Sequence, residues 1–175
     1  MIKLILIVGL IVNYVPKFRL SVFKQLKSLR KISLILFEII IPLVAIIQLY
    51  LLNPKNNFIT YMGIIIFSIG IVLGTIARLQ LRENYLPILA TSPSSRIITN
   101  GIYAYIRHPI YFGTILTIMG FELVLFPFLS LMILIIIPIL VWQINKEEKL
   151  LFKHLKKEWE IYILRTPFKL IPFVY

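Results

Sequence analysis

The feature that most constrains this chain is its long runs of residues without charge. Residues 58–77 contain no charged side chain, and residues 32–52 contain only Glu38. About 20 consecutive apolar residues are enough to cross the hydrocarbon core of a bilayer. Each of these two runs therefore predicts one membrane-spanning helix, and the chain as a whole is predicted to be an all-α, polytopic membrane protein.

A third run, 110–144, is 35 residues long and contains only Glu122 as a charge. That length exceeds one ordinary span. Pro127 lies near the centre of the run, and a proline cannot donate the hydrogen bond that would continue a helix. We therefore expect a tight helical hairpin with helices at about 110–125 and 128–144. The alternative is one long kinked helix, which would overshoot the bilayer by many residues.

A shorter apolar run at 2–15 is interrupted by Asn13. A signal peptide is one interpretation because Lys3 precedes the run, but no small-x-small cleavage site stands before Pro16. We therefore expect a short or tilted first span, which gives about five spans in all. The whole chain, 1–175, is then a single integral membrane domain.

Basic residues are segregated along the chain. The net charge is +12, and 17 of the 19 Lys and Arg residues fall in segments 16–31, 78–109 and 145–175. The five spans would place all three segments on one side, which the positive-inside rule assigns to the cytoplasm. The N-terminus is then outside. Because an anionic leaflet attracts such residues, we expect membrane lipids and no nucleic acid as partners. The chain has no cysteine, which excludes disulfides.

The three basic segments differ in pattern. Segment 16–31 predicts an amphipathic stretch that lies on the membrane surface. Segment 146–164 predicts a helix that leaves the membrane after Gln143 and bends along its surface. Segment 78–109 contains three prolines, and we expect a loop there, with a short extended piece at 96–99.

The segment GIYAYIRHPIY at 101–111 collects polar and aromatic side chains at one membrane edge. Proline is favoured at the first turn of a helix, and it pushes the residue before it out of helical geometry. Pro109 is therefore expected to open the fourth span, with His108 as its cap. Unpaired N–H groups and the dipole of a helix start favour an anion, and Arg107 adds a positive charge there.

The hairpin would bring residues 107–111 opposite residues 145–148. Adjacent helical residues diverge by about 100°, so Glu147 and Glu148 cannot both point inward. One can meet a cation in the site while the other pairs with Arg or Lys. A site with an anion pole and a cation pole suits a zwitterionic, partly aromatic ligand. Lipid headgroups at an interfacial aromatic belt are the alternative occupants. The expected aromatic walls are Tyr103, Tyr105 and Tyr111.

In order and spacing, these motifs resemble those of the isoprenylcysteine carboxyl methyltransferase family, and phospholipid N-methyltransferases share part of the pattern. The resemblance covers about residues 95–175 well. It is carried by G-x-Y-x-x-x-RHP-x-Y-x-G, a hairpin, EE-x-x-L, and a tail of the form Y-x-x-Y-x-x-x-x-P with a final IP. The matching positions are Gly101, Tyr103, Arg107, His108, Pro109, Tyr111, Gly113, Glu147, Glu148, Leu151, Tyr162, Pro167, Ile171 and Pro172, with Trp159 in place of the first tail tyrosine.

The resemblance implies S-adenosyl-L-methionine as the cofactor, held on the cytoplasmic side, and a lipophilic or amphipathic acceptor that enters from the bilayer. Residues 1–77 would supply three spans and a basic loop, and residues 78–175 would form the catalytic region. Arg107 and Glu148 are expected to be catalytic, and no metal is assigned. The implied cofactor-binding positions are Ser95, Arg96, Ile97, Ile98, Tyr103, His108, Pro109, Ile110, Tyr111 and Glu147.

One position departs from the family pattern. Prenylcysteine enzymes usually carry an arginine four residues before the first glutamate, suited to the acceptor's carboxylate. This chain has Gln143 there, which can form hydrogen bonds but carries no charge. We expect Gln143 to bind the substrate and the acceptor to be something other than a prenylcysteine, unless Arg78, Arg82 or Arg165 supplies the charge.

Two other functions remain open. A sterol C14-reductase-like, NADPH-dependent membrane reductase shares the arginine-His-Pro-x-Tyr element and a similar tail, and NADPH binding would identify it. A non-catalytic, lipid-binding membrane protein would bind neither cofactor. A methyltransferase acting on an amine, thiol or phenol would need a base, for which His108 and Glu148 are the candidates, whereas a carboxylate acceptor needs none.

Overall fold

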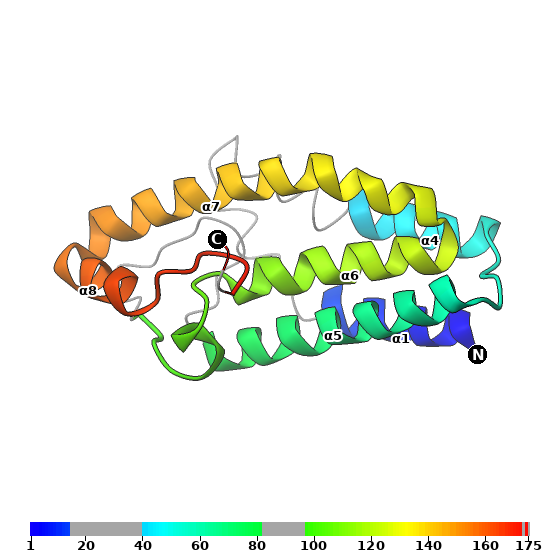
Figure 1. Ribbon diagram of the computed structural model, residues 1–175, viewed down its shortest axis with the longest axis horizontal. Helices are drawn as coiled ribbons and strands as arrows, with labels where there is room; N and C mark the ends of the chain where they lie inside the picture. Colours follow the sequence, from blue (N-terminus) through cyan, green and yellow to red (C-terminus); the bar gives the residue numbers. More distant parts are fainter. Residues whose placement is uncertain (15–39, 82–96, 173, 175) are drawn as a thin grey trace.

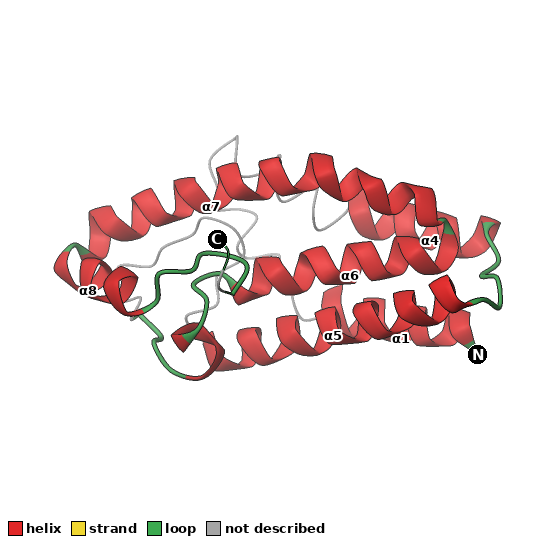
Figure 2. Ribbon diagram, viewed as in Figure 1, coloured by secondary structure: helices red, strands yellow, loops and turns green. Residues whose placement is uncertain are grey.

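The computed structural model describes residues 1–14, 40–81, 97–172 and 174, and every regular element in this part of the chain is a helix (Figure 2). The predicted all-α class is confirmed there. The interfacial stretch expected at 16–31 lies outside the described residues. The elements are α1 (Ile2–Tyr14), α4 (Ile41–Leu51), α5 (Phe58–Leu81), η4 (Gly101–Ala104), α6 (Pro109–Leu125), η5 (Pro127–Met132), α7 (Ile133–Leu155) and α8 (Lys157–Arg165).

The helices run along the long axis of the molecule (Figure 1). The N-terminus, the connection from α4 to α5 and the turn between α6 and α7 lie at one end, whereas η4 and α8 lie at the other. By length and composition, α5 and the stretch Pro127–Leu155 are long and apolar enough to cross a membrane. The other apolar helices, α1, α4 and α6, are shorter. Five spans and their orientation therefore stay predictions.

The predicted helical hairpin is present. Helix α6 ends at Leu125, and the Phe126 N–H donates to Glu122 O at 2.7 Å to close its last turn. Pro127 then begins the short η5 helix, after which α7 runs back along α6. Because Phe126 has left helical geometry, the alternative of one long kinked helix is wrong.

Two predicted boundaries are wrong. Helix α5 continues beyond residue 77 to Leu81, so segment 78–109 is not a loop throughout, and η4 adds a further helical turn within it. Helix α7 does not bend after Gln143 but continues to Leu155. Its continuation is rich in Lys, Glu and Leu, which are good helix formers. The chain bends at Lys156 instead, where φ is 43° and ψ is −112°.

Helix α5 has a local start signal. The Asn57 Oδ1 atom accepts hydrogen bonds from the Thr60 N–H at 2.9 Å and from the Thr60 hydroxyl at 3.0 Å. An asparagine that accepts from the main chain three residues later satisfies one of the unpaired N–H groups of a helix start. Helix α5 begins with this cap at the end of the molecule away from α8, and it runs towards α8.

Helices α5 and α6 approach each other closely along a seam of small residues. An added Cβ at Gly113 would lie 2.8 Å from Gly74 N, and one at Gly63 would lie 2.9 Å from Gly120 O. Helix association in membranes depends on such backbone approach because lipid provides no hydrophobic driving force between helices. The seam fixes α6, and with it the start of α6 at Pro109, against the end of α5.

Two buried clusters complete the packing. One joins α1, α4, α5 and α6, and the other joins α6 and α7 to Leu170 near the C-terminus. A polar contact also links α4 to α6, where Gln48 Nε2 donates to the Glu122 carboxylate at 3.1–3.2 Å. The first cluster is Leu6, Ala45, Leu49, Phe67, Ile71, Phe121, Val124 and Leu125, and the second is Ile115, Leu140, Ile144 and Leu170.

Candidate functional site

The loop that enters the site is fixed by the end of α5. Gly101 has φ of 59°, a left-handed conformation that glycine adopts without steric cost. The next residue, Ile102, donates its N–H to Gln80 Oε1 at 3.1 Å, and the buried Tyr103 hydroxyl donates to Ala77 O at 3.3 Å. These contacts hold η4 beside α5 and direct the following residues towards α6.

The start of α6 has the predicted form. Pro109 occupies the first turn, and His108 is the capping residue, with φ of −125° and ψ of 57°. The N–H groups of Arg107 and His108 donate to Phe168 O at 3.0 Å and to Lys169 O at 2.9 Å. Two donors of the predicted anion pole are therefore used by the C-terminal part of the chain, which the sequence analysis did not anticipate.

The C-terminal strap, defined as Thr166–Leu170, lies against this loop. The Arg107 Nη1 atom donates to Thr166 O at 3.0 Å, and the Tyr162 hydroxyl of α8 donates to Tyr103 O at 2.9 Å. Burial raises the pKa of Tyr162 well above its ordinary value, so this hydroxyl stays a donor. The strap and α8 thus enclose the loop from the side opposite α5.

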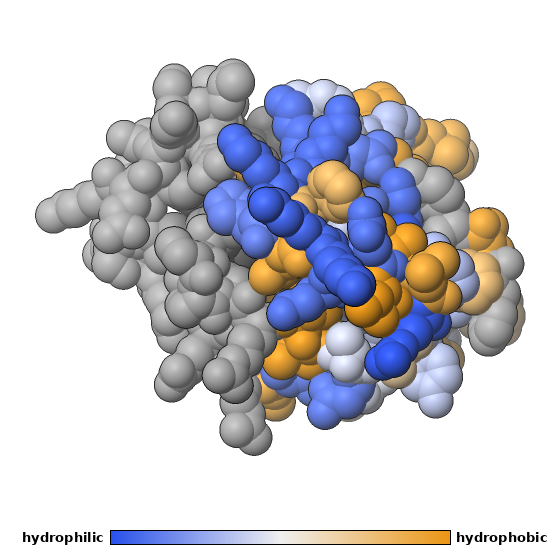
Figure 3. All heavy atoms as spheres, turned by 90° about the vertical axis from the view of Figure 1, so that its left-hand side faces the viewer, coloured by the Kyte–Doolittle hydropathy of each residue, from blue (hydrophilic) through white to orange (hydrophobic). Residues whose placement is uncertain are grey.

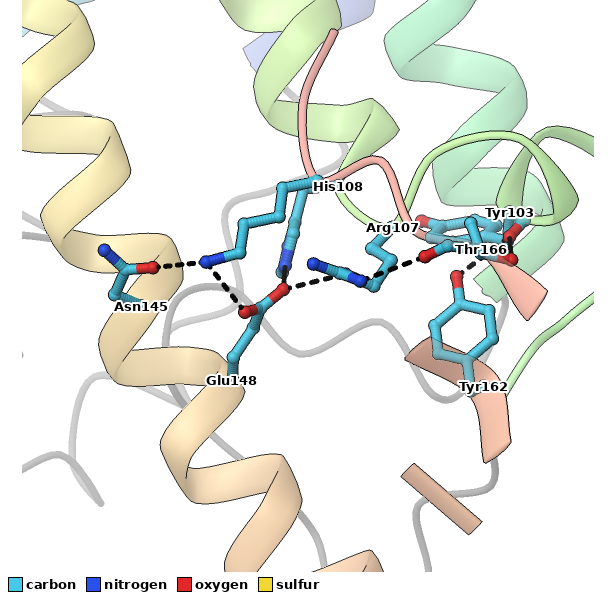
Figure 4. A network of polar contacts seen from close by, with 8 residues as sticks. Tyr103, Arg107, His108, Asn145, Glu148, Tyr162 and Thr166 are labelled. Atoms are coloured by element: carbon cyan, nitrogen blue, oxygen red, sulfur yellow. Dashed lines mark hydrogen bonds and ion pairs between the residues drawn. The ribbon is translucent and has the colours of Figure 1, made fainter. Parts of the chain in front are cut away.

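Glu148 is the centre of a charged network between the hairpin and the strap (Figure 4). Its Oε1 atom accepts from Arg107 Nε at 2.9 Å and lies 3.2 Å from His108 Nε2. Its Oε2 atom lies 3.3 Å from Lys169 Nζ. Arg107 and His108 are only 6% and 5% exposed. The predicted meeting of residues 107–111 with residues 145–148 is therefore observed.

The partners of Glu148 keep it ionised. The apolar part of α7 ends at Ile144, so Glu148 lies outside the span predicted at 128–144. Burial alone would raise the pKa of this carboxyl group, but the hydrogen bond from His108 and the charges of His108, Arg107 and Lys169 outweigh burial and lower it to about 2. A carboxylate held this way is a poor proton acceptor near neutral pH.

Glu147 has different surroundings. Its Oε2 atom accepts from the Tyr111 hydroxyl at 3.0 Å, and its Oε1 atom has no hydrogen-bond partner among the described residues. The side chain is half-buried. One half of the expected division is observed, because Glu148 pairs with cations of the chain. That Glu147 meets the cation of a ligand stays a prediction.

Gln143 lies one helical turn before Glu147, on the same side of α7. It is 2% exposed, and its Nε2 atom is buried without a hydrogen-bond partner in the described part of the chain. A buried unpaired N–H group costs about 1–3 kcal/mol. An orphaned donor at this place is consistent with a ligand group that accepts from it.

The other predicted site residues are placed as follows. Ile97 and Ile98 are half-buried and belong to no helix or strand, and the extended piece expected at 96–99 begins outside the described residues. Tyr105 is 68% exposed and does not form a wall. Ser95 and Arg96 lie outside the described residues, and Pro109 and Ile110 form the first turn of α6. Figure 3 shows this end of the molecule, where hydrophilic side chains predominate with hydrophobic ones between them.

Three arginines could supply the charge that Gln143 lacks. Arg78 is buried and donates to Asn13 Oδ1 at 2.9 Å, which links α5 to α1. Arg165 is exposed at the end of α8. Arg82 lies outside the described residues. The described contacts of Arg78 and Arg165 therefore do not direct either charge to Gln143.

Sequence reasoning missed the strap as part of the site. Lys169 contacts both Glu148 and Asn145, and Thr166 is 2% exposed. The signals in the sequence were the tail positions Pro167, Ile171 and Pro172 that match the family pattern, and a lysine between the two prolines. Which helix such a tail packs on cannot be inferred from periodicity.

Comparison with known proteins gives a family. No curated protein and no solved structure matches the chain. The isoprenylcysteine carboxyl methyltransferase (ICMT) family matches residues 62–153, which is more than half of the chain. This region includes α6, most of α7, and the glutamate pair with its partners Arg107, His108 and Tyr111. The chain therefore belongs to the isoprenylcysteine carboxyl methyltransferase family, whose members are membrane-embedded methyltransferases.

Proposed function

We propose that this protein transfers a methyl group from S-adenosyl-L-methionine to a lipophilic or amphipathic acceptor that enters from the bilayer. The observation that carries the proposal is the unequal environment of two adjacent glutamates. Glu148 is held by Arg107, His108 and Lys169, whereas Glu147 is bonded only to the Tyr111 hydroxyl among the described residues. Glu147 is thus suited to an external cation.

The residues present fit the cofactor. The Glu147 carboxylate suits the ammonium of its methionine end, and charge-assisted hydrogen bonds of this kind are strong. The half-buried side chains of Ile97 and Ile98 suit the adenine ring. When bound, the cofactor supplies a methyl group activated by a sulfonium. The protein aligns the two reactants and excludes water from them.

Arg107 and Glu148 act in this proposal mainly by fixing the start of α6. Their ion pair joins the loop before α6 to α7, and Arg107 also holds Thr166 O. His108 and Tyr111, which follow Arg107 in the chain, are thereby held at the mouth of the hairpin. A shift of about 1 Å in such positioning can cost on the order of a hundredfold in rate.

Of the two candidate bases, the contacts favour His108. Arg107 occupies one carboxylate oxygen of Glu148 and Lys169 the other, so Glu148 is the poorer proton acceptor. Glu148 binds His108 at Nε2, and when that nitrogen carries the proton, Nδ1 is the ring atom able to accept one. For an acceptor that carries O–H, S–H or N–H, His108 would take the proton while the acceptor's bond to the methyl group forms and the bond from sulfur to that methyl group breaks.

Gln143 supports a neutral or basic acceptor rather than a prenylcysteine. A carboxylate brought into this region would need a cationic partner, because an unpaired charge at low dielectric is costly. Gln143 offers a neutral N–H donor with no other partner in the described residues. It would orient the acceptor by a hydrogen bond to its polar head.

The function is tested with the purified protein in lipid nanodiscs. Radiolabelled S-adenosyl-L-methionine is added together with a lipid extract, and the labelled product is identified. The proposal expects label in the lipid phase, with strong loss in Glu147→Gln and none in the exposed His154→Gln. NADPH binding without S-adenosyl-L-methionine binding would refute it in favour of the reductase, and binding of neither in favour of a non-catalytic protein.

A further inference from the structure

We propose that Lys169 is a positioning residue that holds the two adjacent glutamates in their different orientations. It lies outside the region matched to the family, which ends at residue 153. The part of this inference that concerns the cofactor rests on the proposed function. The part that concerns the strap rests on the contacts alone.

Lys169 bridges two residues of one helix face. Its Nζ atom lies 2.8 Å from Asn145 Oδ1 and 3.3 Å from Glu148 Oε2. Asn145 and Glu148 are three residues apart on α7, so their side chains are neighbours on the same face. The ammonium group therefore fixes the direction of the Glu148 side chain, and because Glu147 diverges from Glu148 on the helix, it fixes which glutamate remains towards Tyr111.

The main chain of the strap determines where this ammonium group lies. The carbonyl groups of Phe168 and Lys169 accept from the N–H groups of Arg107 and His108. On the other side of Lys169, Leu170 is 1% exposed and packs with Ile115 and Ile144. The main chain is thus held in place on both sides of Lys169, and the Lys169 side chain is only 25% exposed.

The consequence is reciprocal support between the strap and the glutamate pair. Without the ammonium group, Glu148 Oε2 loses its cationic partner and Asn145 loses its donor, while Glu148 Oε1 retains Arg107 and His108. The carboxylate is then free to rotate about its remaining contacts, and the strap loses this polar side-chain contact with α7. Both the cofactor affinity through Glu147 and the packing of the strap should respond.

The strap is tested first without any cofactor. The chain has no cysteine, so Leu170→Cys introduces a unique thiol at a buried position, and Val174→Cys, which is 76% exposed, gives the unhindered rate. Maleimide should label Leu170→Cys slowly, and adding Lys169→Met should raise that rate at least tenfold. Lys169→Arg should restore protection, and Lys157→Met, at an exposed lysine of α8, should leave it unchanged. If maleimide labels Leu170→Cys at the same rate with and without Lys169→Met, the proposal is overturned.

A second measurement tests whether Lys169 acts through Glu148. The Kd for S-adenosyl-L-methionine should rise about three- to tenfold in Lys169→Met and recover in Lys169→Arg. In a Glu148→Gln background the same change should have no further effect, because a residue that acts through another shows full coupling in a double-mutant cycle. Additive losses would refute positioning. If the protein with Lys169 and Glu148 intact does not bind the cofactor, the proposed function fails, and the thiol labelling still decides the strap.

Discussion

At the scale of single residues, neutralising one or the other of two neighbouring glutamates of α7 is predicted to have different effects. One change should weaken cofactor binding, and the other should lower stability. Glu147→Gln removes a charge that forms no ion pair within the described part of the chain, so folding should be little changed. A lost charge-assisted hydrogen bond costs about 1.5–3 kcal/mol, which is roughly a ten- to hundredfold rise in Kd. Calorimetric titration with S-adenosyl-L-methionine should show this rise in Glu147→Gln and a smaller one in Glu148→Gln. Equal or reversed losses would contradict the assignment.

Glu148→Gln should instead change stability, and its effect should depend on pH. The pKa of Glu148 is lowered from 4.5 to about 2 in the folded protein. A depressed carboxyl pKa stabilises the fold above the unfolded value, and that stabilisation is lost as pH falls through the folded value. Each pKa unit corresponds to about 1.4 kcal/mol, so the contribution near neutral pH is on the order of 3 kcal/mol.

The difference in melting temperature between the unmodified protein and Glu148→Gln should therefore be largest at pH 7 and shrink between about pH 4.5 and pH 2. The exposed Glu160→Gln provides a control, for which we expect a small difference at every pH. A difference for Glu148→Gln that stays constant down to pH 2.5 would show that the charged network does not stabilise the fold.

At the scale of elements, alanine substitutions at two buried glycines of the seam between α5 and α6 should have different effects on stability. Gly113→Ala places a Cβ 2.8 Å from Gly74 N and 2.9 Å from Gly70 O, and backbone atoms cannot yield without moving a helix. Overpacking of this kind costs about 1–3 kcal/mol. In Gly74→Ala the nearest atoms to the added Cβ belong to the Arg78 side chain, at 3.5 Å or more, and this change should be neutral or stabilising. Unfolding in mixed micelles would measure both, and equal destabilisation would argue against close helix approach.

The bend between α7 and α8 is a second prediction for an element. Lys156 has φ of 43° and ψ of −112°, where a Cβ is strained and glycine is not. Lys156→Gly should raise the melting temperature and stabilise the fold by about 0.5–1 kcal/mol, since relief of strain exceeds the entropy cost of glycine. Lys156→Ala keeps a Cβ and should bring no gain. If the two variants behave alike, the bend is not strained.

At the scale of the whole molecule, the sequence predicted what depends on local patterns. Charge-free runs located the helices, Pro127 located the turn of the hairpin, and Pro109 located the start of α6. The hairpin then placed residues 107–111 opposite residues 145–148 by geometry alone. In each of these parts of the fold and site, the type of residue at one position or in one run determines the local structure.

Contacts between segments far apart in the sequence could not be predicted in this way. The strap has no periodicity, so neither its pairing with Arg107 and His108 nor the bridge from Lys169 to Asn145 was visible. The extension of α5 to Leu81 depends on Arg78 and Gln80 finding partners in other elements. In each case the contact joins segments far apart in the sequence, which local patterns do not reveal.

The orientation of the whole molecule in the membrane is the last prediction. In the structure the connection from α4 to α5 and helix α8 lie at opposite ends (Figure 1), and the lysine-rich last turns of α7 lead into α8. The positive-inside rule then puts α8 in the cytoplasm and the connection outside. Because the chain has no cysteine, Asn56→Cys and Glu158→Cys each provide a unique thiol at an exposed site. A membrane-impermeant maleimide applied to intact cells should label Asn56→Cys, and it should label Glu158→Cys only after permeabilisation. The reverse pattern would place the glutamate pair and its ligand on the outer face, and labelling of both in intact cells would mean that an even number of the helices between the two thiols, or none of them, spans the membrane.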